Sequence, residues 1–293
     1  MNQLNGFQVF TEIESRILRA IPSSIIRLGD GEGAIMGFPD ITNRPQVDRS
    51  LSIWFGTKSF SEETIVDLAI RLRSAVRNAD LLGLPREKQV SLHPLYKAVL
   101  ESIDYYKLQS PTQLIADAAL HRYMQFALFF RRLLMNKEFV GIITPRTQLT
   151  QTLKDNFNIK KIDAYSIKGE SKHSGDEQTP HFPDRFFELE RNLTVPFKGA
   201  LFLVGAGALG KIYCDWIKQR GGIALDIGAI FDAWAQVKSR LVHPCHSFQQ
   251  YIDNPEITMQ QAIVRYNQLC DHFELDTPRI EPADYQNILH EKW

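Results

Sequence analysis

The chain has 293 residues, with 34 Lys or Arg balanced by 34 Asp or Glu, so its formal net charge at pH 7 is zero. Hydrophobic residues make up 44% and charged residues 23%, values typical of globular proteins that exclude disordered, collagen-like and coiled-coil classes. The charge balance argues against nucleic acid as a partner, because a phosphate-binding surface needs an excess of Lys and Arg.

Cysteine usage and the lack of targeting signals predict a cytoplasmic protein. Cys214, Cys245 and Cys270 are odd in number and form no CxxC pair, which favours a reducing compartment. The first 20 residues lack the apolar core of a signal peptide. The longest apolar stretch, residues 200–210, is shorter than the ~20 residues of a membrane helix. We therefore expect no transmembrane segment, and either a free protein or one peripheral at the inner face of the membrane.

Hydrophobic periodicity predicts strands and helices that alternate along the chain. In chain order, the expected elements are a helix over 7–19, a strand over 24–28, a helix over 61–79, a strand over 80–84, a helix over 112–134, a strand over 139–144, a helix over 148–157, a strand over 160–166, a strand over 200–204, a helix over 208–220, a strand over 222–226 and a helix over 255–269. Residues 168–184 are polar and broken by Gly and Pro, which predicts a long surface loop.

This order predicts an α/β fold, Rossmann-like, with a mostly parallel sheet covered by helices on both faces. We expect a single domain over residues 1–293, with a core at about 20–240 and a C-terminal helical extension at about 241–293. In such folds ligands bind at the carboxyl ends of the strands. Three predicted strand ends carry unusual residues.

The first strand ends in the segment IIRLGDGEG, residues 25–33. Its glycines, among them Gly29 and Gly31, permit tight backbone geometry. Asp30 and Glu32 offer hard carboxylate oxygens, which suit Mg²⁺ or Mn²⁺, and Arg27 precedes them. The alternative is a glycine-rich turn in which Asp30 caps a helix.

The second strand ends in LFLVGAGALGK, residues 201–211. Gly205, Gly207 and Gly210 satisfy the GxGxxG pattern of dinucleotide-binding folds, with Asp226 where a ribose-binding acid is expected. Lys211 completes GxxxxGK, but Ile follows it where a P-loop needs Ser or Thr. Either way, backbone N–H groups at a helix N-terminus favour an anion. Close packing of helix on strand through small residues is the alternative.

The third strand ends in IALDIGAIFDAW, residues 223–234. Asp226 at the strand terminus suits ribose hydroxyls or a loop-ordering role. Trp234 offers either a stacking surface for a base or sugar, or simple core packing.

Together these segments resemble the bacterial glycosyltransferases of the GT-D fold, over roughly residues 25–234, with RxGDGE as the most specific element. The resemblance implies transfer of a sugar from a nucleotide-diphosphate donor, expected to be a UDP-sugar, to a glycan or lipid-linked glycan in surface polysaccharide or glycoprotein assembly. It also implies that the DxE motif, here Asp30 and Glu32, holds Mn²⁺ or Mg²⁺. An NAD(P)-dependent oxidoreductase is the alternative, and the choice between a monomer and a homo-oligomer stays open.

The resemblance also suggests site roles for individual residues. The donor-binding residues are predicted to be Arg27, Gly29, Asp30, Gly31, Glu32, Gly205, Gly207, Gly210, Lys211 and Asp226. An inverting reaction needs a base for the acceptor hydroxyl, for which we predict Asp232 and His181, with Glu170 and Asp184 as alternatives. A retaining reaction needs no such base. A zinc site in the segment HPCH, residues 243–246, is disfavoured because zinc ligands usually come from separated pairs.

Overall fold

One parallel sheet organises the chain, whose computed structural model describes residues 3–56, 59–170, 180–239, 246–272, 279–281 and 292. Within these residues, seven strands pair in the order β3-β2-β1-β7-β6-β4-β5, and every pairing is parallel. The strands are β1 (Ser23–Arg27), β2 (Leu81–Leu84), β3 (Leu114–Asp117), β4 (Phe139–Thr144), β5 (Lys161–Ser166), β6 (Leu201–Val204) and β7 (Ile223–Asp226).

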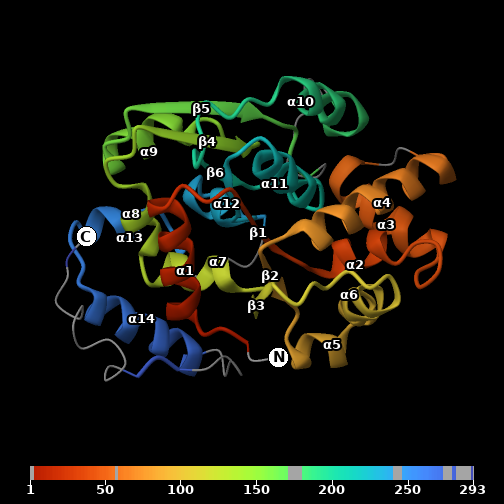
Figure 1. Ribbon diagram of the computed structural model, residues 1–293, viewed down its shortest axis with the longest axis horizontal. Coiled ribbons are helices and arrows are strands. Elements are labelled where there is room, and N and C mark those ends of the chain that lie inside the picture. The colour runs from red at the N-terminus through yellow and green to blue at the C-terminus, as the bar shows by residue number, and fades with distance from the viewer. Residues whose placement is uncertain are drawn as a thin grey trace.

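Helices connect the strands and cover both faces of the sheet (Figure 1). They are α1 (Gly6–Leu18), α2 (Asp30–Met36), α3 (Arg44–Phe55), α4 (Glu62–Asn78), α5 (Glu87–Leu92), α6 (Pro94–Tyr105), α7 (Leu120–Phe126), α8 (Phe129–Leu134), α9 (Leu149–Phe157), α10 (Phe186–Asn192), α11 (Leu209–Gln219), α12 (Ile230–Trp234), α13 (Gln249–Asp253) and α14 (Met259–His272), with a π-helical turn, η2 (His181–Arg185). None of these described helices is long and apolar enough to cross a membrane.

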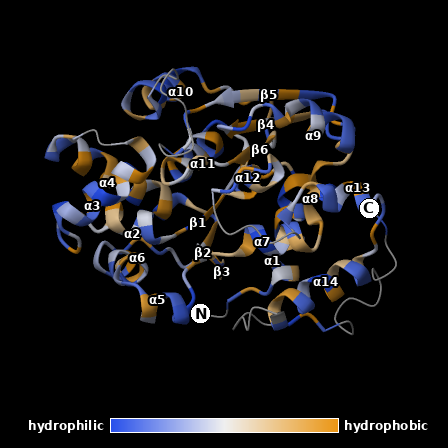
Figure 2. Ribbon diagram, turned by 180° about the vertical axis from the view of Figure 1, so that it is seen from behind, coloured by the Kyte–Doolittle hydropathy of each residue, from blue (hydrophilic) through white to orange (hydrophobic). Residues whose placement is uncertain are grey.

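Two hydrophobic cores lie on opposite faces of the sheet, because successive strand side chains point in opposite directions. Ile25 of β1 belongs to the core formed with α1, α7, α8, α9, α12, α13 and α14. Its neighbour Ile26 belongs to the core formed with α2, α3, α4, α6, α10 and α11. Figure 2 shows hydrophobic segments gathered at the centre, with hydrophilic ones on outer helices such as α3 and α10. The five inner strands β1, β2, β4, β6 and β7 are largely buried on both faces, as their continuous apolar runs predict, whereas the edge strands β3 and β5 are partly exposed.

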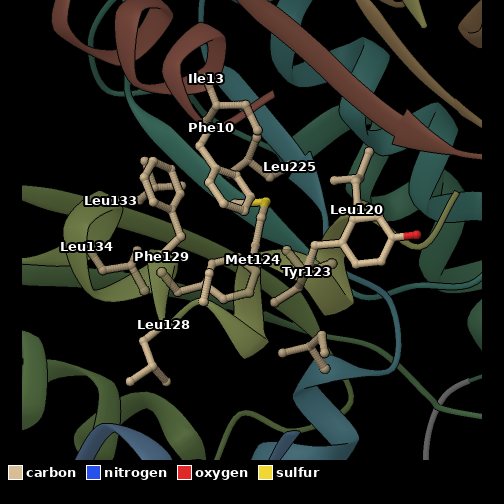
Figure 3. Packing of buried hydrophobic residues seen from close by; sticks show 14 of the residues in the cluster. Phe10, Ile13, Leu120, Tyr123, Met124, Leu128, Phe129, Leu133, Leu134 and Leu225 are labelled. Atoms are coloured by element: carbon tan, nitrogen blue, oxygen red, sulfur yellow. The ribbon is translucent and has the colours of Figure 1, made fainter. Parts of the chain in front are cut away.

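The first core is built largely from aromatic and branched side chains of α1, α7 and α8 (Figure 3). Phe10 of α1 stacks on Phe129 of α8 with ring centroids 4.4 Å apart. Tyr123 and Met124 of α7 are also buried there, next to Leu225 of β7. This packing fixes α7 against the sheet and thereby sets the position of residues at its start.

The structure confirms the α/β fold and most of the predicted elements, with two corrections. Of the predicted surface loop over 168–184, residues 171–179 lie outside the described residues, and residues 181–184 belong to the turn η2, in which His181 and Phe182 are buried. Residues 112–134 are not a single helix: they contain strand β3, then α7 and α8. Leu128, between the two helices, adopts a left-handed backbone conformation with φ of 57°, which interrupts the helix that periodicity alone suggested. Because β3 is short and partly exposed, its alternation is weak, and the helical pattern that follows it dominated the prediction.

The chain order of the strands places a crevice at the carboxyl ends of β1 and β7. From β1 the chain runs outward to β2 and β3, then crosses to the other half of the sheet and returns to place β7 beside β1. Ligands of open α/β sheets bind where the strand order changes direction in this way. The segments 25–33 and 223–234 therefore meet at this point, although they are far apart in the sequence.

Candidate active site

A pocket of about 240 Å³ opens at the carboxyl edge of the sheet. It brings together many of the predicted site residues, namely Arg27, Gly29, Asp30, Glu32, Gly205, Gly207, Lys211, Asp232 and His181, with the alternative base Glu170. Gly31, Gly210 and Asp226 are not among the lining residues, and Asp184 is exposed outside the pocket. The fold thus brings predicted site residues from four separate segments of the chain to one place.

The turn between β1 and α2 is fixed by the DxE segment itself. The backbone N–H of Gly29, which caps α2, donates to Glu32 Oε2 at 2.9 Å. This is half of a capping box, in which the third residue of a helix bonds back to the cap. Asp30 is the first residue of α2 rather than its cap and is exposed at the pocket, with Oδ1 accepting from the Gly31 N–H at 2.9 Å. The two acids therefore have different environments.

A buried charge network joins the three strand ends. Lys211 Nζ lies 2.6 Å from Glu32 Oε1 and 2.8 Å from Asp226 Oδ2, and all three residues are buried. Burial would lower the pKa of Lys211, but the charges of Asp226 and Glu32 raise it above its ordinary value. Burial would raise the pKa of Asp226, and the charges of Arg27 and Lys211 lower it instead. Lys211 is therefore an ammonium, and Asp226 a carboxylate, at neutral pH.

Arg27 extends this network to the pocket surface. Its Nε lies 3.4 Å from Asp226 Oδ2, and its Nη1 donates to the Ala118 carbonyl at 3.2 Å. Because Asp226 also accepts from the Gly228 N–H at 3.1 Å, its carboxylate is occupied by protein groups. This geometry does not present Asp226 to a ribose, as the oxidoreductase alternative requires.

Trp54 of α3 lines the pocket and was not singled out by the sequence. An added Cβ on Gly31 would lie 2.3 Å from Trp54 Cη2, and one on Gly207 would lie 3.1 Å from its Nε1. Only glycine permits such close approach at both positions, and Gly207 also has a positive φ of 57°. The two glycine segments thus form a slot in which the half-buried indole ring is held.

The two predicted bases lie in the pocket in different surroundings. Asp232 Oδ1 accepts from Arg146 Nε at 2.6 Å, and its Oδ2 accepts from the Ser239 hydroxyl. His181 is buried with Nε2 2.8 Å from the Tyr213 hydroxyl oxygen. Burial, helped by the charge of Arg185, lowers the pKa of His181 to about 3, so its imidazole is neutral at neutral pH. The role of either residue as a base stays a prediction.

Several cationic or aromatic residues of the pocket also escaped the sequence analysis. They are Arg86 after β2, His121 and Arg122 at the start of α7, and Tyr96 of α6. Arg86 could have been found from the sequence, because it follows a predicted strand that is closed by Pro85. His121 and Arg122 were hidden because the prediction of one long helix over 112–134 concealed the end of β3.

The carboxylates do not fit a metal chelated by Asp30 and Glu32 together. Both Glu32 oxygens are engaged, one by a backbone N–H and the other by the Lys211 ammonium. Among the described residues, no group of three or more His, Cys, Asp or Glu side chains is arranged to hold a metal. Asp30 alone presents an oxygen to the pocket, and Mg²⁺ often binds through one carboxylate plus substrate phosphates.

Burial decides between the two roles that the sequence left open for Trp234. Trp234 is buried, with its Nε1 donating to Gln125 Oε1 at 2.7 Å and its ring packed against Phe130 and Phe248. It is a core residue and not a stacking surface. Of the HPCH segment, residues 243–245 lie outside the described part of the chain, and His246 is buried.

Comparisons with known proteins agree with this architecture. Residues 4–234 match the family model of a GT-D fold-like domain. A solved structure of the domain of unknown function 1792, described as having a distinct glycosyltransferase fold, has a TM-score of 0.54 and 15% identity, covering 87% of this chain and 89% of that chain. A selenomethionine-substituted structure of the same domain has a TM-score of 0.50 and 16% identity, with the same coverage. No curated protein matches the sequence.

Proposed function

Because the chain belongs to the GT-D-like family and has a glycosyltransferase fold, we propose that it transfers a sugar from a nucleotide-diphosphate donor to a glycan or lipid-linked glycan acceptor. A UDP-sugar is the proposed donor, and bacterial surface polysaccharide or glycoprotein assembly at the cytoplasmic side is the proposed setting. In this reaction the bond between the anomeric carbon and the diphosphate oxygen breaks, and the acceptor oxygen bonds to that carbon.

The strongest support is an anion-binding corner where α11 begins. Ala206 and Gly207 line the pocket, and no acceptor within the described part of the chain takes a hydrogen bond from their N–H groups. The N-terminus of a helix favours negative charge through such N–H groups and its dipole. Lys211 lies one turn further on and donates to the Gly207 carbonyl at 3.2 Å, which orients this loop. A departing nucleoside diphosphate fits this corner.

Trp54 is proposed to stack on the base or sugar of the donor. Replacing Trp54 with Ala is expected to weaken UDP binding by about 1–3 kcal/mol, the range for loss of base–aromatic stacking, or roughly 5–150-fold in Kd. Isothermal titration calorimetry with UDP measures this effect. Trp54→Phe keeps an aromatic face and should retain most of the affinity. Equal affinity of the Ala variant and the unaltered protein would contradict a stacking role.

Mn²⁺ or Mg²⁺ is proposed to act through Asp30 and the donor phosphates. When bound, such an ion neutralises charge on the departing diphosphate. Glu32 contributes differently, because it holds the β1–α2 turn and neutralises Lys211. Asp232 is the proposed proton acceptor for the acceptor hydroxyl in an inverting reaction. Both predicted bases line the pocket and both have protein partners, Arg146 and Ser239 for Asp232 and Tyr213 for His181, but the low pKa of His181 makes it the weaker base.

Nucleotide release from a panel of UDP-sugars tests the proposed function. Release is expected to require Mn²⁺ or Mg²⁺ and to fall by about 100-fold or more in Asp30→Asn, the effect of removing one group that stabilises the transition state. Glu62→Gln is a matched control, because Glu62 is an exposed acid in the first turn of a different helix, α4. Metal-independent release that is unchanged in Asp30→Asn would remove the role given to Asp30.

A thermal-shift comparison of NADH with UDP separates the oxidoreductase alternative. Binding of NADH, measured by thermal shift, without any effect of UDP or UDP-sugars would overturn the glycosyltransferase proposal. The occupied carboxylate of Asp226 favours the opposite result, because a ribose hydroxyl finds no free acceptor there.

A further inference from the structure

Three adjacent strands each deliver an arginine to one side of the pocket. Arg27 ends β1, Arg86 follows β2 and Arg122 follows β3 in the first turn of α7, and all three line the pocket. Because the strands lie in the order β3-β2-β1, these cations form a row along the carboxyl edge. We call Arg86, Arg122 and His121 the arginine subsite.

The charges of this subsite are poorly compensated by the protein. The Arg122 guanidinium makes no hydrogen bond or ion pair with any described residue. Arg86 Nε donates a long hydrogen bond of 3.4 Å to the neutral Gln89 Oε1 and lies 3.8 Å from Asp117 Oδ2, an oxygen that already accepts from the Tyr123 hydroxyl. Arg122 is exposed at the pocket, so its cation is accessible to a ligand.

His121 adds a buried polar atom to the same place. Its side chain is 5% exposed, and its Nδ1 has no hydrogen-bond partner among the described residues. A buried polar atom without a partner destabilises the protein, and the position of this atom beside two guanidinium groups points to a ligand that completes the site. Burial and the charges of Arg27 and Arg122 lower the pKa of His121 well below its ordinary value, which leaves a neutral ring able to donate one hydrogen bond.

The position of the arginine subsite separates it from the anion-binding corner of α11. That corner follows β6, whereas Arg86 follows β2, three strand positions away in the sheet. Neighbouring strands are about 4.8 Å apart, so the two places lie on the order of 14 Å from each other. A single donor diphosphate held at α11 is not placed to satisfy Arg86 and Arg122 as well.

We propose that the arginine subsite binds a second anionic group, a phosphoryl group carried by the acceptor, while the donor diphosphate occupies the corner at α11. Planar guanidinium groups bind phosphoryl oxygens through paired hydrogen bonds. The inference rests on the proposed function for the identity of the two substrates, but the subsite itself follows from the row of cations. It assigns a specificity for phosphorylated acceptors, such as glycans linked through phosphate.

Competition between UDP and inorganic pyrophosphate tests this arrangement. Calorimetry is expected to show pyrophosphate binding both to the free protein and to the protein saturated with UDP. Arg122→Gln should weaken pyrophosphate binding to the UDP-saturated protein by about 10-fold or more, the loss of one charge-assisted hydrogen bond, and should change the Kd of UDP less than about threefold. Arg122→Lys should recover part of the affinity.

Arg19→Gln is the control for unspecific charge effects, because Arg19 is exposed just after α1, before the chain enters β1 at the opposite edge of the sheet. If Arg19→Gln weakened pyrophosphate binding as much as Arg122→Gln does, the arginine subsite would be overturned. So would UDP blocking all pyrophosphate binding, or Arg122→Gln weakening UDP and pyrophosphate alike, since both would assign the arginines to the donor. If UDP fails to bind at all, the donor proposal fails, and pyrophosphate binding to the free protein still tests Arg122.

Discussion

Replacing Lys211 with Met is expected to lower the free energy of unfolding by about 3–5 kcal/mol, because it leaves two buried carboxylates without their cation. Lys211 is 2% exposed and contacts both Glu32 and Asp226. Urea denaturation at pH 7, followed by circular dichroism, measures the effect. The same variant should lose nucleotide release, because the β1–α2 turn and the α11 loop are both tied to this ammonium.

Two further variants separate the buried network from a general effect of losing a lysine. Lys218 lies on the same helix, α11, and forms an ion pair with Asp80 at the opposite edge of the sheet, where its side chain is partly exposed. Lys218→Met is therefore expected to lower the free energy of unfolding by no more than about 1 kcal/mol. Combining Lys211→Met with Glu32→Gln and Asp226→Asn removes the uncompensated charges and should recover much of the stability. A Lys211→Met protein as stable as Lys218→Met would show that the network is solvated.

Stability is expected to fall on mild acidification, with His181 as one identifiable cause. Its pKa is about 3 in the folded protein, against an ordinary value of 6.5, so below pH 6.5 the unfolded chain binds a proton that the folded one does not. Each pH unit in that range costs about 1.4 kcal/mol. Between pH 7 and pH 5 the contribution of His181 is therefore a loss of about 2 kcal/mol, and its stabilising contribution is fully present only above pH 6.5.

Comparison with His181→Gln isolates this contribution from that of other titrating groups. Glutamine can still bond to the Tyr213 hydroxyl but does not titrate, so the variant should lose about 2 kcal/mol less stability than the unaltered protein between pH 7 and pH 5. Urea denaturation at the two pH values gives the difference. Identical pH dependence of the two proteins, or a His181 NMR signal that titrates between pH 6 and pH 7, would contradict the low pKa.

The sequence predicted the parts of the fold where one signal dominates. Strands such as 139–144 are continuous apolar runs closed by Pro, and the structure places β4 at those residues. The GxGxxG loop was correctly placed between a strand and a helix, here β6 and α11. The two acids at residues 30 and 32 were also placed correctly at the pocket.

What escaped prediction depends on distant contacts. No local pattern shows that Glu32 pairs with Lys211, because 178 intervening residues separate them in the chain. Trp54 lies in a helix that periodicity did not indicate, and it reaches the pocket only because two glycine segments leave space for its ring. The helical pattern that follows β3 concealed this strand. Arg122, which follows β3 and lines the pocket, was therefore also missed.

The insertion of β7 between β1 and β6 has a consequence for how the protein is made. Arg27 and Asp226 are 199 positions apart, and ribosomes add roughly 5–20 residues per second. The edge of β1 that pairs with β7 therefore stays unpaired for on the order of 10–40 s during synthesis. Throughout that interval the nascent chain carries an open, apolar strand edge, which is covered only when the last quarter of the chain begins to emerge.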